Sequence, residues 1–169
     1  MGWEDDTHGA PGRVESALDE LTEDLPCDFL VLKDREFEPE EILVPTAGGP
    51  DSDLSAEVTK LLRREYDSRV TFLHVADSHD EGEAFLEQWA EEHGLGDVAL
   101  RVETGDVESA IERAATDNLM MIIGATERGL FSRLVRGSLV LDVVGGVECS
   151  VPLAERPGSR GVLHRLTGD

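Results

Sequence analysis

Short apolar runs alternate with amphipathic helical patterns from residue 41 to residue 155, and this alternation restricts the fold more than any other feature. Each pair of neighbouring runs is separated by a segment with helical periodicity or by a longer connection that contains one. Strands that alternate with helices of about a dozen residues form a parallel sheet with helices on both faces. We therefore expect an α/β fold. The runs with strand character are Glu41–Thr46, Arg69–Asp77, Asp97–Glu103, Leu119–Gly124 and Cys149–Glu155.

The strand-like runs differ in their expected positions in the sheet. Leu119–Gly124 (LMMIIG) is wholly apolar, as a central parallel strand covered on both faces must be. Cys149–Glu155 contains Pro152, which cannot donate to a strand ladder, so this run is expected at an edge.

The intervening segments carry helix start signals and apolar stripes. After the AGGPD turn cluster, Asp51 or Asp53 can cap a helix. A second helix is predicted over Glu81–His93, and a third follows the N-cap Asp106. A fourth is expected around Ser138–Val144. The apolar stripe of the first helix is predicted to consist of Leu54, Val58, Leu61 and Leu62.

The charge is strongly acidic: 37 acidic residues against 15 basic ones give a net charge of −22. Only Lys33 and Lys60 are lysines. At molar salt the repulsion between carboxylates is screened within about 3 Å, so we interpret this surface as salt adaptation, as in a halophilic protein. Intrinsic disorder is the alternative, but disordered chains lack periodic apolar segments. The charge excludes nucleic acid as a partner, because phosphate binding needs basic surface.

The sequence gives no sign of membrane insertion or secretion. It contains no run of 18 apolar residues, and its first residues lack the apolar core of a signal peptide. Two cysteines, Cys27 and Cys149, are too few for a disulfide scaffold and are expected as reduced, packed thiols. A cytoplasmic location is expected.

The first 35 residues repeat a later part of the chain. At a constant offset of 122 residues, without gaps, Gly2 falls on Gly124 and Cys27 falls on Cys149. The stretch would then be the last loop, helix and strand of a preceding copy of the same fold. A lone helix and strand cannot bury their apolar faces. We expect Asp28–Lys33 to pair with Cys149–Glu155 and cover that edge, while a flexible leader is the alternative.

Two glycine-containing loops follow strand-like runs and are candidates for ligand binding. They are Pro45–Gly49 and Gly124–Ser138. Parallel sheets bind ligands beyond the carboxyl ends of their strands, and glycine at a helix N-terminus lets an anion approach the backbone. The alternative is that these glycines are only turn residues.

The segments ILVPT, TFLHV, ETGD and MMIIGATERG…RGS together resemble the universal stress protein family, over about Glu41 to Arg156. With PTAGGP and the repeat, they are similar to the tandem domains attached to amino-acid transporters and cation/proton antiporters in halophilic archaea. The resemblance implies a Rossmann-like open parallel five-stranded sheet of order 3-2-1-4-5. It also implies a homodimer or pseudo-dimer through the last strand, and an adenine nucleotide, ATP or AMP, with Mg²⁺.

The family's ATP motif is matched in part. Gly124, Gly137 and Ser138 have its spacing, but Glu127 stands where a glycine is expected. Ala47 stands where the family places a ribose-binding carboxylate. The nucleotide site that the resemblance implies comprises Pro45, Thr46, Ala47, Val75, Gly124, Thr126, Glu127, Gly137, Ser138 and Leu139. The pocket is either a nucleotide site or a degenerate one.

No pattern nominates catalysis. His74 has no nucleophile or base beside it in the sequence and is interpreted as a packed or hydrogen-bonded histidine, and Met120 and Met121 as core. Asp51, Asp53 and Asp106 are interpreted as helix caps and not as metal ligands.

The sequence therefore predicts a non-catalytic regulatory module that senses adenine nucleotide. The alternative is an interaction domain with a degenerate pocket that regulates a membrane transporter or antiporter by docking. The expected organisation is a repeat remnant over 1–38, a universal stress protein domain over 39–156 and a tail over 157–169.

Overall fold

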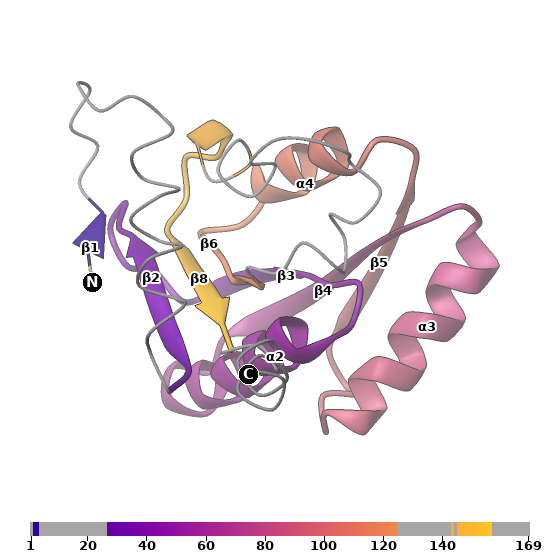
Figure 1. The fold of residues 1–169 in the computed structure, drawn as a ribbon, viewed down its shortest axis with the longest axis horizontal. Helices are drawn as coiled ribbons and strands as arrows, with labels where there is room; N and C mark the ends of the chain where they lie inside the picture. The colour runs from indigo at the N-terminus through magenta and orange to yellow at the C-terminus, as the bar shows by residue number, and fades with distance from the viewer. Residues whose placement is uncertain (1, 4–26, 125–142, 144, 157–169) are drawn as a thin grey trace, which may run out of the picture.

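The computed structural model describes residues 2–3, 27–124, 143 and 145–156. The ribbon has an α/β architecture, with strands in the middle and helices packed on both sides (Figure 1). The strands are β1 (Gly2–Trp3), β2 (Phe29–Lys33), β3 (Glu41–Pro45), β4 (Arg69–Ala76), β5 (Ala99–Thr104), β6 (Met120–Met121), β7 (Ile123–Gly124) and β8 (Val151–Glu155). The helices are α2 (Pro50–Tyr66), α3 (His79–Glu92) and α4 (Val107–Ala115).

One sheet has the order β5-β4-β3-β6, and all its strand pairs are parallel. Its register places Leu43 of β3 beside Thr71 of β4 and Met121 of β6. Each pair of parallel neighbours β3–β4 and β4–β5 is joined by a crossover helix, as parallel strands require. The α/β fold predicted from the alternation of runs and helices is thus confirmed.

The apolar run Leu119–Gly124 is divided between this sheet and a second one. Its β6 part pairs with β3, and its β7 part pairs with β8. The amide of Met121 donates to the carbonyl of Ser150 and that of Ile122 donates to the carbonyl of Leu43, both at 2.9 Å. The second sheet has the order β1-β2-β8-β7. The two sheets therefore meet along one apolar run, whose neighbours are β3 on one side and β8 on the other, and a parallel bridge between Met120 and Ser150 joins them there.

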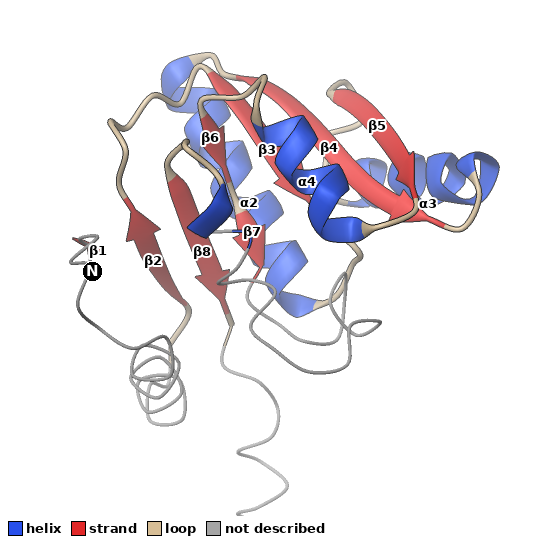
Figure 2. Cartoon of the chain, turned by 90° about the horizontal axis from the view of Figure 1, so that it is seen from above, coloured by secondary structure: helices blue, strands red, loops and turns tan. Residues whose placement is uncertain are grey.

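Strand β8 lies between two neighbours (Figure 2). On one side it runs parallel to β7, and on the other it runs antiparallel to β2, with Phe29 opposite Glu155 and Lys33 opposite Val151. The predicted pairing of Asp28–Lys33 with the last strand is confirmed. The edge position inferred from Pro152 is wrong, because in the part of the chain that the structure describes β8 pairs with β2 on the side away from β7.

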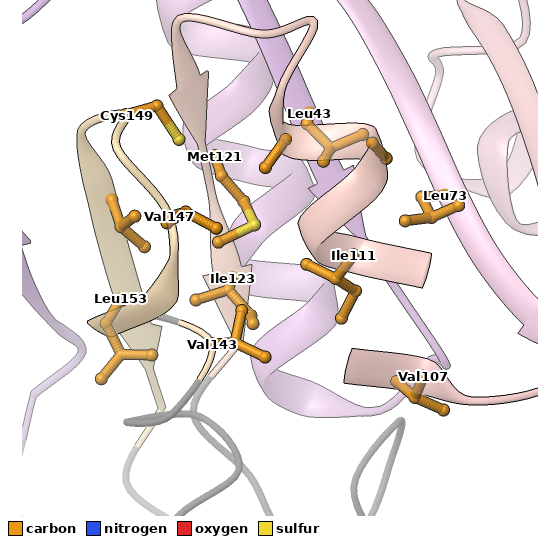
Figure 3. Close-up of a cluster of buried hydrophobic side chains, with 13 residues drawn as sticks. Leu43, Leu73, Val107, Ile111, Met121, Ile123, Val143, Val147, Cys149 and Leu153 are labelled. Carbon is orange, nitrogen blue, oxygen red and sulfur yellow. The ribbon is translucent and has the colours of Figure 1, made fainter. Parts of the chain in front are cut away.

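Two buried clusters lie on opposite sides of the strands. On one side a cluster joins α4 to residues of β3, β4, β6, β7 and β8, and Ile111, Met121, Ile123 and Val143 are fully buried in it (Figure 3). On the other side α2 and α3 pack over β3 and β4. There the ring of Phe72 meets that of Trp89 edge-on, with centroids 4.9 Å apart. The prediction that the methionines of the apolar run are core residues is confirmed.

Helix α2 begins earlier than its predicted caps. Its N-cap is Gly49, with no side-chain hydrogen bond, and Pro50 occupies the first turn. Proline suits this position because its missing N–H would have had no partner there. The capping roles predicted for Asp51 and Asp53 are therefore wrong. Asp51 is fully buried, and Asp53 lies 3.1 Å from Nε2 of His93.

The buried face of α2 is more polar than its apolar stripe predicts. Leu61 is 54% exposed, whereas Ser55, Ala56 and Thr59 are fully buried. The hydroxyl of Ser55 donates to the carbonyl of Asp51 at 2.9 Å, and that of Thr59 donates to Ser55 at 2.7 Å. These bonds within the helix satisfy the hydroxyls, so small polar residues can face the sheet at close range.

The predicted start of the third helix is confirmed. Asp106 is the N-cap of α4, and its Oδ1 accepts the amide of Ser109 at 2.9 Å. The expected fourth helix lies mostly outside the described residues, with Val143, Gly145 and Gly146 helical. Both cysteines are free. Cys149 is buried as expected, but Cys27 is exposed, so its predicted packing is wrong. Among the helices described here, none has the length and apolar character needed to cross a membrane.

Candidate functional site

The carboxyl ends of β3 and β4 meet at Thr46, which is fully buried. Its amide donates to the carbonyl of Leu73 at 2.8 Å, which extends the β3–β4 ladder past the end of the strand. Its carbonyl oxygen lies 2.8 Å from Nδ1 of His74, and its hydroxyl accepts the amide of Gly48 at 3.2 Å. These bonds use all the polar groups of Thr46 and fix the start of the loop that follows β3.

The register of the sheet places the described candidate residues near one another. The β3–β4 pairing ends with Pro45 opposite Leu73, and Ala47 and Val75 each follow two residues later on their own strand or loop. The β3–β6 pairing ends with Leu43 opposite Met121, and Gly124 follows three residues later in β7. Ala47 and Val75 both pack against the buried cluster under α4. The structure thus brings together Pro45, Thr46, Ala47, Val75 and Gly124 at one end of the sheet.

Gly124 packs directly on the first turn of α2. A Cβ atom at this position would lie 2.8 Å from the carbonyl carbon of Asp51 and 3.0 Å from its Cβ. No real Cβ atom tolerates such contacts with backbone, so the close approach of β7 to α2 requires glycine. The sequence had singled out Gly124 for its place in a loop motif. The structure gives it a packing role as well.

Asp51 ties this contact to the end of β8. Its Oδ1 accepts the amide of Arg156 at 2.7 Å, and among the described residues its buried Oδ2 has no hydrogen-bond partner. The guanidinium of Arg156 reaches Glu57 on α2 at 3.1 Å and Asp28, just before β2, at 3.3 Å. The hydrogen bond with Glu57, together with both carboxylates, raises the pKa of Arg156. One arginine thus connects the candidate site to both strands of the β2–β8 pair.

An aromatic pair lines the loop after β3. The rings of His74 and Phe85 stack with centroids 4.3 Å apart, and the Phe85 ring lies 3.5 Å from where a Cβ would be at Gly48. His74 is half-buried and hydrogen-bonded to Thr46, as predicted from the sequence. The sequence predicts only a helix over Glu81–His93, which contains Phe85. The spacing of Phe85 from His74 carried no sign that the two would meet beside the loop.

The carboxylate next to Val75 is neutralised by arginines. Glu103 lies opposite Val75 on β5 and accepts two hydrogen bonds from Arg101, at 2.7 and 2.9 Å, and one from Arg113 at 3.4 Å. The hydrogen bonds from Arg101 hold the pKa of Glu103 below its usual range. The negative charge is therefore permanent at neutral pH and is already paired.

The other predicted residues, Thr126, Glu127, Gly137, Ser138 and Leu139, lie outside the described residues. Among those the structure describes, no group of three or more His, Cys, Asp or Glu side chains could hold a metal ion. Among the described residues, the site therefore offers backbone amides and carbonyls, the half-buried Gly124 and the apolar side chains of Ala47 and Val75. Such groups bind and orient a ligand, and none of them is poised as a nucleophile with an adjacent base.

Several solved structures share this architecture. No protein-family model matches the chain, and no curated protein matches it. Three solved structures illustrate the matches. A universal stress protein from Archaeoglobus fulgidus is 18% identical with a TM-score of 0.65, covering 95% of this chain and 61% of that one. The cytoplasmic domain of a prokaryotic cation chloride cotransporter is 13% identical with a TM-score of 0.63, covering 92% and 64%. A universal stress protein in complex with cAMP is 16% identical with a TM-score of 0.52, covering 66% and 93%.

The three matches differ in how much of each chain they cover. This chain spans less than two thirds of the Archaeoglobus protein and of the cotransporter domain. The cAMP-bound protein is covered almost entirely but matches only two thirds of this chain. At these identities the likeness concerns the fold. The chain has the α/β, Rossmann-like fold of universal stress proteins.

Proposed function

We propose that this chain is a non-catalytic regulatory module that binds an adenine nucleotide, ATP or AMP, at the loops after β3 and β7. The observation that carries the proposal is that parallel strands β3, β4 and β7 end on the same side of the molecule, where Thr46 is hydrogen-bonded to Leu73 and His74 of β4. Ligands of open α/β sheets bind beyond the carboxyl ends of the strands, and this is such an end. The rest of the proposed site is Pro45, Ala47, Val75, Gly124, Thr126, Glu127, Gly137, Ser138 and Leu139.

The described residues offer surface for the adenine base, but they offer less for the ribose. Val75 and Ala47 offer apolar surface for a flat base on the α4 side of the strand ends, whereas the His74–Phe85 pair lies on the α3 side. Ala47 has no oxygen to accept a ribose hydroxyl. Asp51 is fully buried, so its carboxylate does not replace that acceptor without a movement of the loop. The described residues also contribute no cluster for Mg²⁺.

The cAMP complex of a protein with the same fold supports an adenine nucleotide over other ligands. The test is thermal unfolding in molar KCl with and without millimolar ATP, AMP or cAMP, each with and without Mg²⁺. Saturation at a hundredfold excess over Kd stabilises the native state by about 2.7 kcal/mol. The Ala47→Asp variant, which restores a carboxylate, should bind more tightly than the parent. Absence of any shift for both proteins contradicts the proposal.

A second candidate function is docking to a membrane transporter with a degenerate pocket. Its support is the likeness to the cotransporter's cytoplasmic domain, which covers 92% of this chain. Thermal unfolding with and without nucleotide distinguishes docking from nucleotide binding. A chain that binds no nucleotide in either form, while remaining folded, favours docking.

We also propose that residues 1–38 are a partial second copy of the unit formed by 39–156, followed by a tail over 157–169. The pairing register supports this. Gly2 lies opposite Leu32, and their equivalents at the offset of 122 residues, Gly124 and Ala154, lie opposite each other in the same way. The pair β2–β8 would then form a pseudo-dimer interface within one chain.

A further inference from the structure

The strands of the first sheet begin at the end of the molecule opposite the candidate site. The amide of Arg69, the first residue of β4, donates to the carbonyl of Glu40 at 2.8 Å, and the amide of Leu119, just before β6, donates to the carbonyl of Glu41 at 3.1 Å. Both neighbours of β3 therefore start beside its first residue. The connection from β2 to β3 and the end of α2 reach the same place. We call residues 34–41, 64–69 and 117–119 the amino-end surface.

Three large apolar side chains are exposed on the amino-end surface. Phe37 is 42% exposed, Tyr66 52% and Leu119 42%. The rings of Phe37 and Tyr66 meet edge-on with centroids 5.8 Å apart, so the connection before β3 and the end of α2 present one aromatic pair. Leu119 lies beside the start of β3 on the β6 side. An exposed apolar group with a polar rim is typical of a surface that binds another protein.

A carboxylate stands next to each aromatic residue, at positions where the backbone favours glycine. Glu36 directly precedes Phe37 and has a φ of 70°, and Asp67 directly follows Tyr66 and has a φ of 55°. They are the two non-glycine residues with a positive φ in the described part of the chain. Side chains are disfavoured in this left-handed region, and glycine would avoid the cost. The sequence thus keeps a carboxylate beside each ring at the expense of stability.

The charge of the amino-end surface restricts what can bind there. The surface contains eight carboxylates and three arginines. Two of these arginines are already paired, Arg69 with Glu41 and Arg64 with Glu65. A second copy of the chain would bring the same carboxylates together, and an anionic membrane would add further negative charge, so both are disfavoured. A cationic partner is favoured.

We propose that the amino-end surface binds a segment of another protein in which apolar side chains are flanked by lysines or arginines. The apolar side chains of this segment cover Phe37, Tyr66 and Leu119, and its cations pair with Glu36 and Asp67. The faces of the two aromatic rings attract cations as well. The surface lies at the opposite end of the strands from the nucleotide site proposed above, so the inference does not depend on nucleotide binding.

The test measures the affinity of the full chain for a fluorescent amphipathic helix of leucine and lysine, about 18 residues long, by anisotropy. Molar KCl is used because it screens the general field of a chain of net charge −22 within about 3 Å, so that close contacts decide the affinity. A scrambled peptide of the same composition controls for charge alone. The parent should bind the amphipathic peptide at least about tenfold more tightly than the scrambled one, a difference of one hot-spot contact.

Leu119→Ser and Leu30→Ser form a matched pair of variants. The two leucines are similarly exposed, at 42% and 41%, but Leu30 lies opposite Ala154, near the other end of the strands. Leu119→Ser should weaken peptide binding about five- to tenfold, and Leu30→Ser should leave it within about twofold of the parent. Equal affinities for these two variants, or a parent that does not prefer the amphipathic peptide, overturn the proposal.

Glu36→Gly and Asp67→Gly separate binding from folding. The amide of Asp67 and the carbonyl of Glu36 keep their hydrogen bonds in these variants, because both bonds are made by the backbone. The urea midpoint should stay equal or rise as the left-handed backbone is relieved, while the peptide binds about two- to fivefold more weakly. A lower midpoint with unchanged affinity means that the carboxylates are only structural and overturns their assigned role. A parent dimer that Leu119→Ser dissociates means that a second copy occupies the surface, and it overturns the proposal as well.

Discussion

The two sheets of the molecule are assembled from different kinds of contact. In β5-β4-β3-β6, neighbours are parallel, joined by nearby helices and covered by apolar clusters on both faces. In β1-β2-β8-β7, residues 29–33 meet residues 151–155 from far along the chain. Polar contacts hold the strands there: the buried Lys33, the hydroxyl of Ser150 and the ion pair of Arg156 with Asp28. The first sheet depends on burial of apolar surface. In the second sheet, β7 and β8 share this apolar burial, whereas β2 is held against β8 by a few polar contacts as well.

The largest effect should come from the apolar core of the first sheet. Phe72 is fully buried and packs edge-on against Trp89, so Phe72→Ala should lower the free energy of unfolding by about 3–5 kcal/mol. Leu30→Ala in β2 is the control, because Leu30 is 41% exposed and should cost less than about 1 kcal/mol. Urea unfolding in molar KCl measures both. Equal losses would mean that the two sheets depend on burial to the same extent.

The contact of β7 with α2 should have the next largest effect. Gly124→Ala places a Cβ 2.8 Å from backbone of α2, and the resulting overpacking should cost about 1–3 kcal/mol. Gly145→Ala is the matched control, because a Cβ there meets no atom within 4 Å. The control should be neutral or slightly stabilising, since alanine loses less backbone entropy on folding. Equal urea midpoints for the two variants would contradict the tight approach of β7 to α2.

Lowering the salt concentration should affect the two sheets differently. With a net charge of −22, repulsion extends over about 30 Å at 0.01 M salt but only about 3 Å at 1 M. We expect the amides of β2 to exchange with deuterium at least tenfold faster on transfer from molar to 0.01 M KCl, while those of β3 and β4 change less. Hydrogen exchange followed by mass spectrometry measures this difference. Parallel acceleration in all three strands would show that both sheets open as one unit.

The same difference explains which parts of the fold the sequence could predict. The strands of the first sheet and the start of α4 follow from short-range periodicity and a capping residue, and their bounds differ from prediction by one or two residues. The start of α2 was misplaced because Pro50 and Gly49 took the role assigned to Asp51. Leu61 was assigned to the core because apolar spacing alone does not reveal that Ser55 and Thr59 can satisfy their hydroxyls inside the helix.

The candidate site shows a similar limit. Thr46 and Gly124 could be proposed from the sequence, because the loops after the strands of a parallel sheet lie on one side, whereas Val75 was implied by the family resemblance. The stacking of Phe85 on His74 and the link from Asp51 to Arg156 could not be proposed, because they join residues on different elements through side-chain geometry. The pairing of β2 with β8 is an intermediate case. The internal repeat suggested this pairing, but the sequence carried no sign that the buried ammonium group of Lys33 would donate to the carbonyl of Val147.

The smallest effect should come from a purely local feature, the cap of α4. The hydrogen bond from the amide of Ser109 lowers the pKa of Asp106, so the carboxylate is stabilised in the folded state. A lowered pKa contributes stability above the ordinary carboxyl range near about pH 4, and that contribution is lost as pH falls through the folded value. Asp106→Ala should lower Tm by a few degrees at pH 7 and by less near about pH 3.

Asp80→Ala is the control for this cap, because Asp80 lies in the first turn of α3 behind the N-cap Ser78 and loses the same charge. Thermal unfolding of both variants at the two pH values separates the cap from the general effect of removing one carboxylate. An Asp106→Ala loss that is the same at both pH values would contradict a role for the ionised cap. A loss confined to neutral pH would place α4 with the locally encoded half of the molecule, in contrast to α2, whose start depends on backbone geometry and on packing against β7.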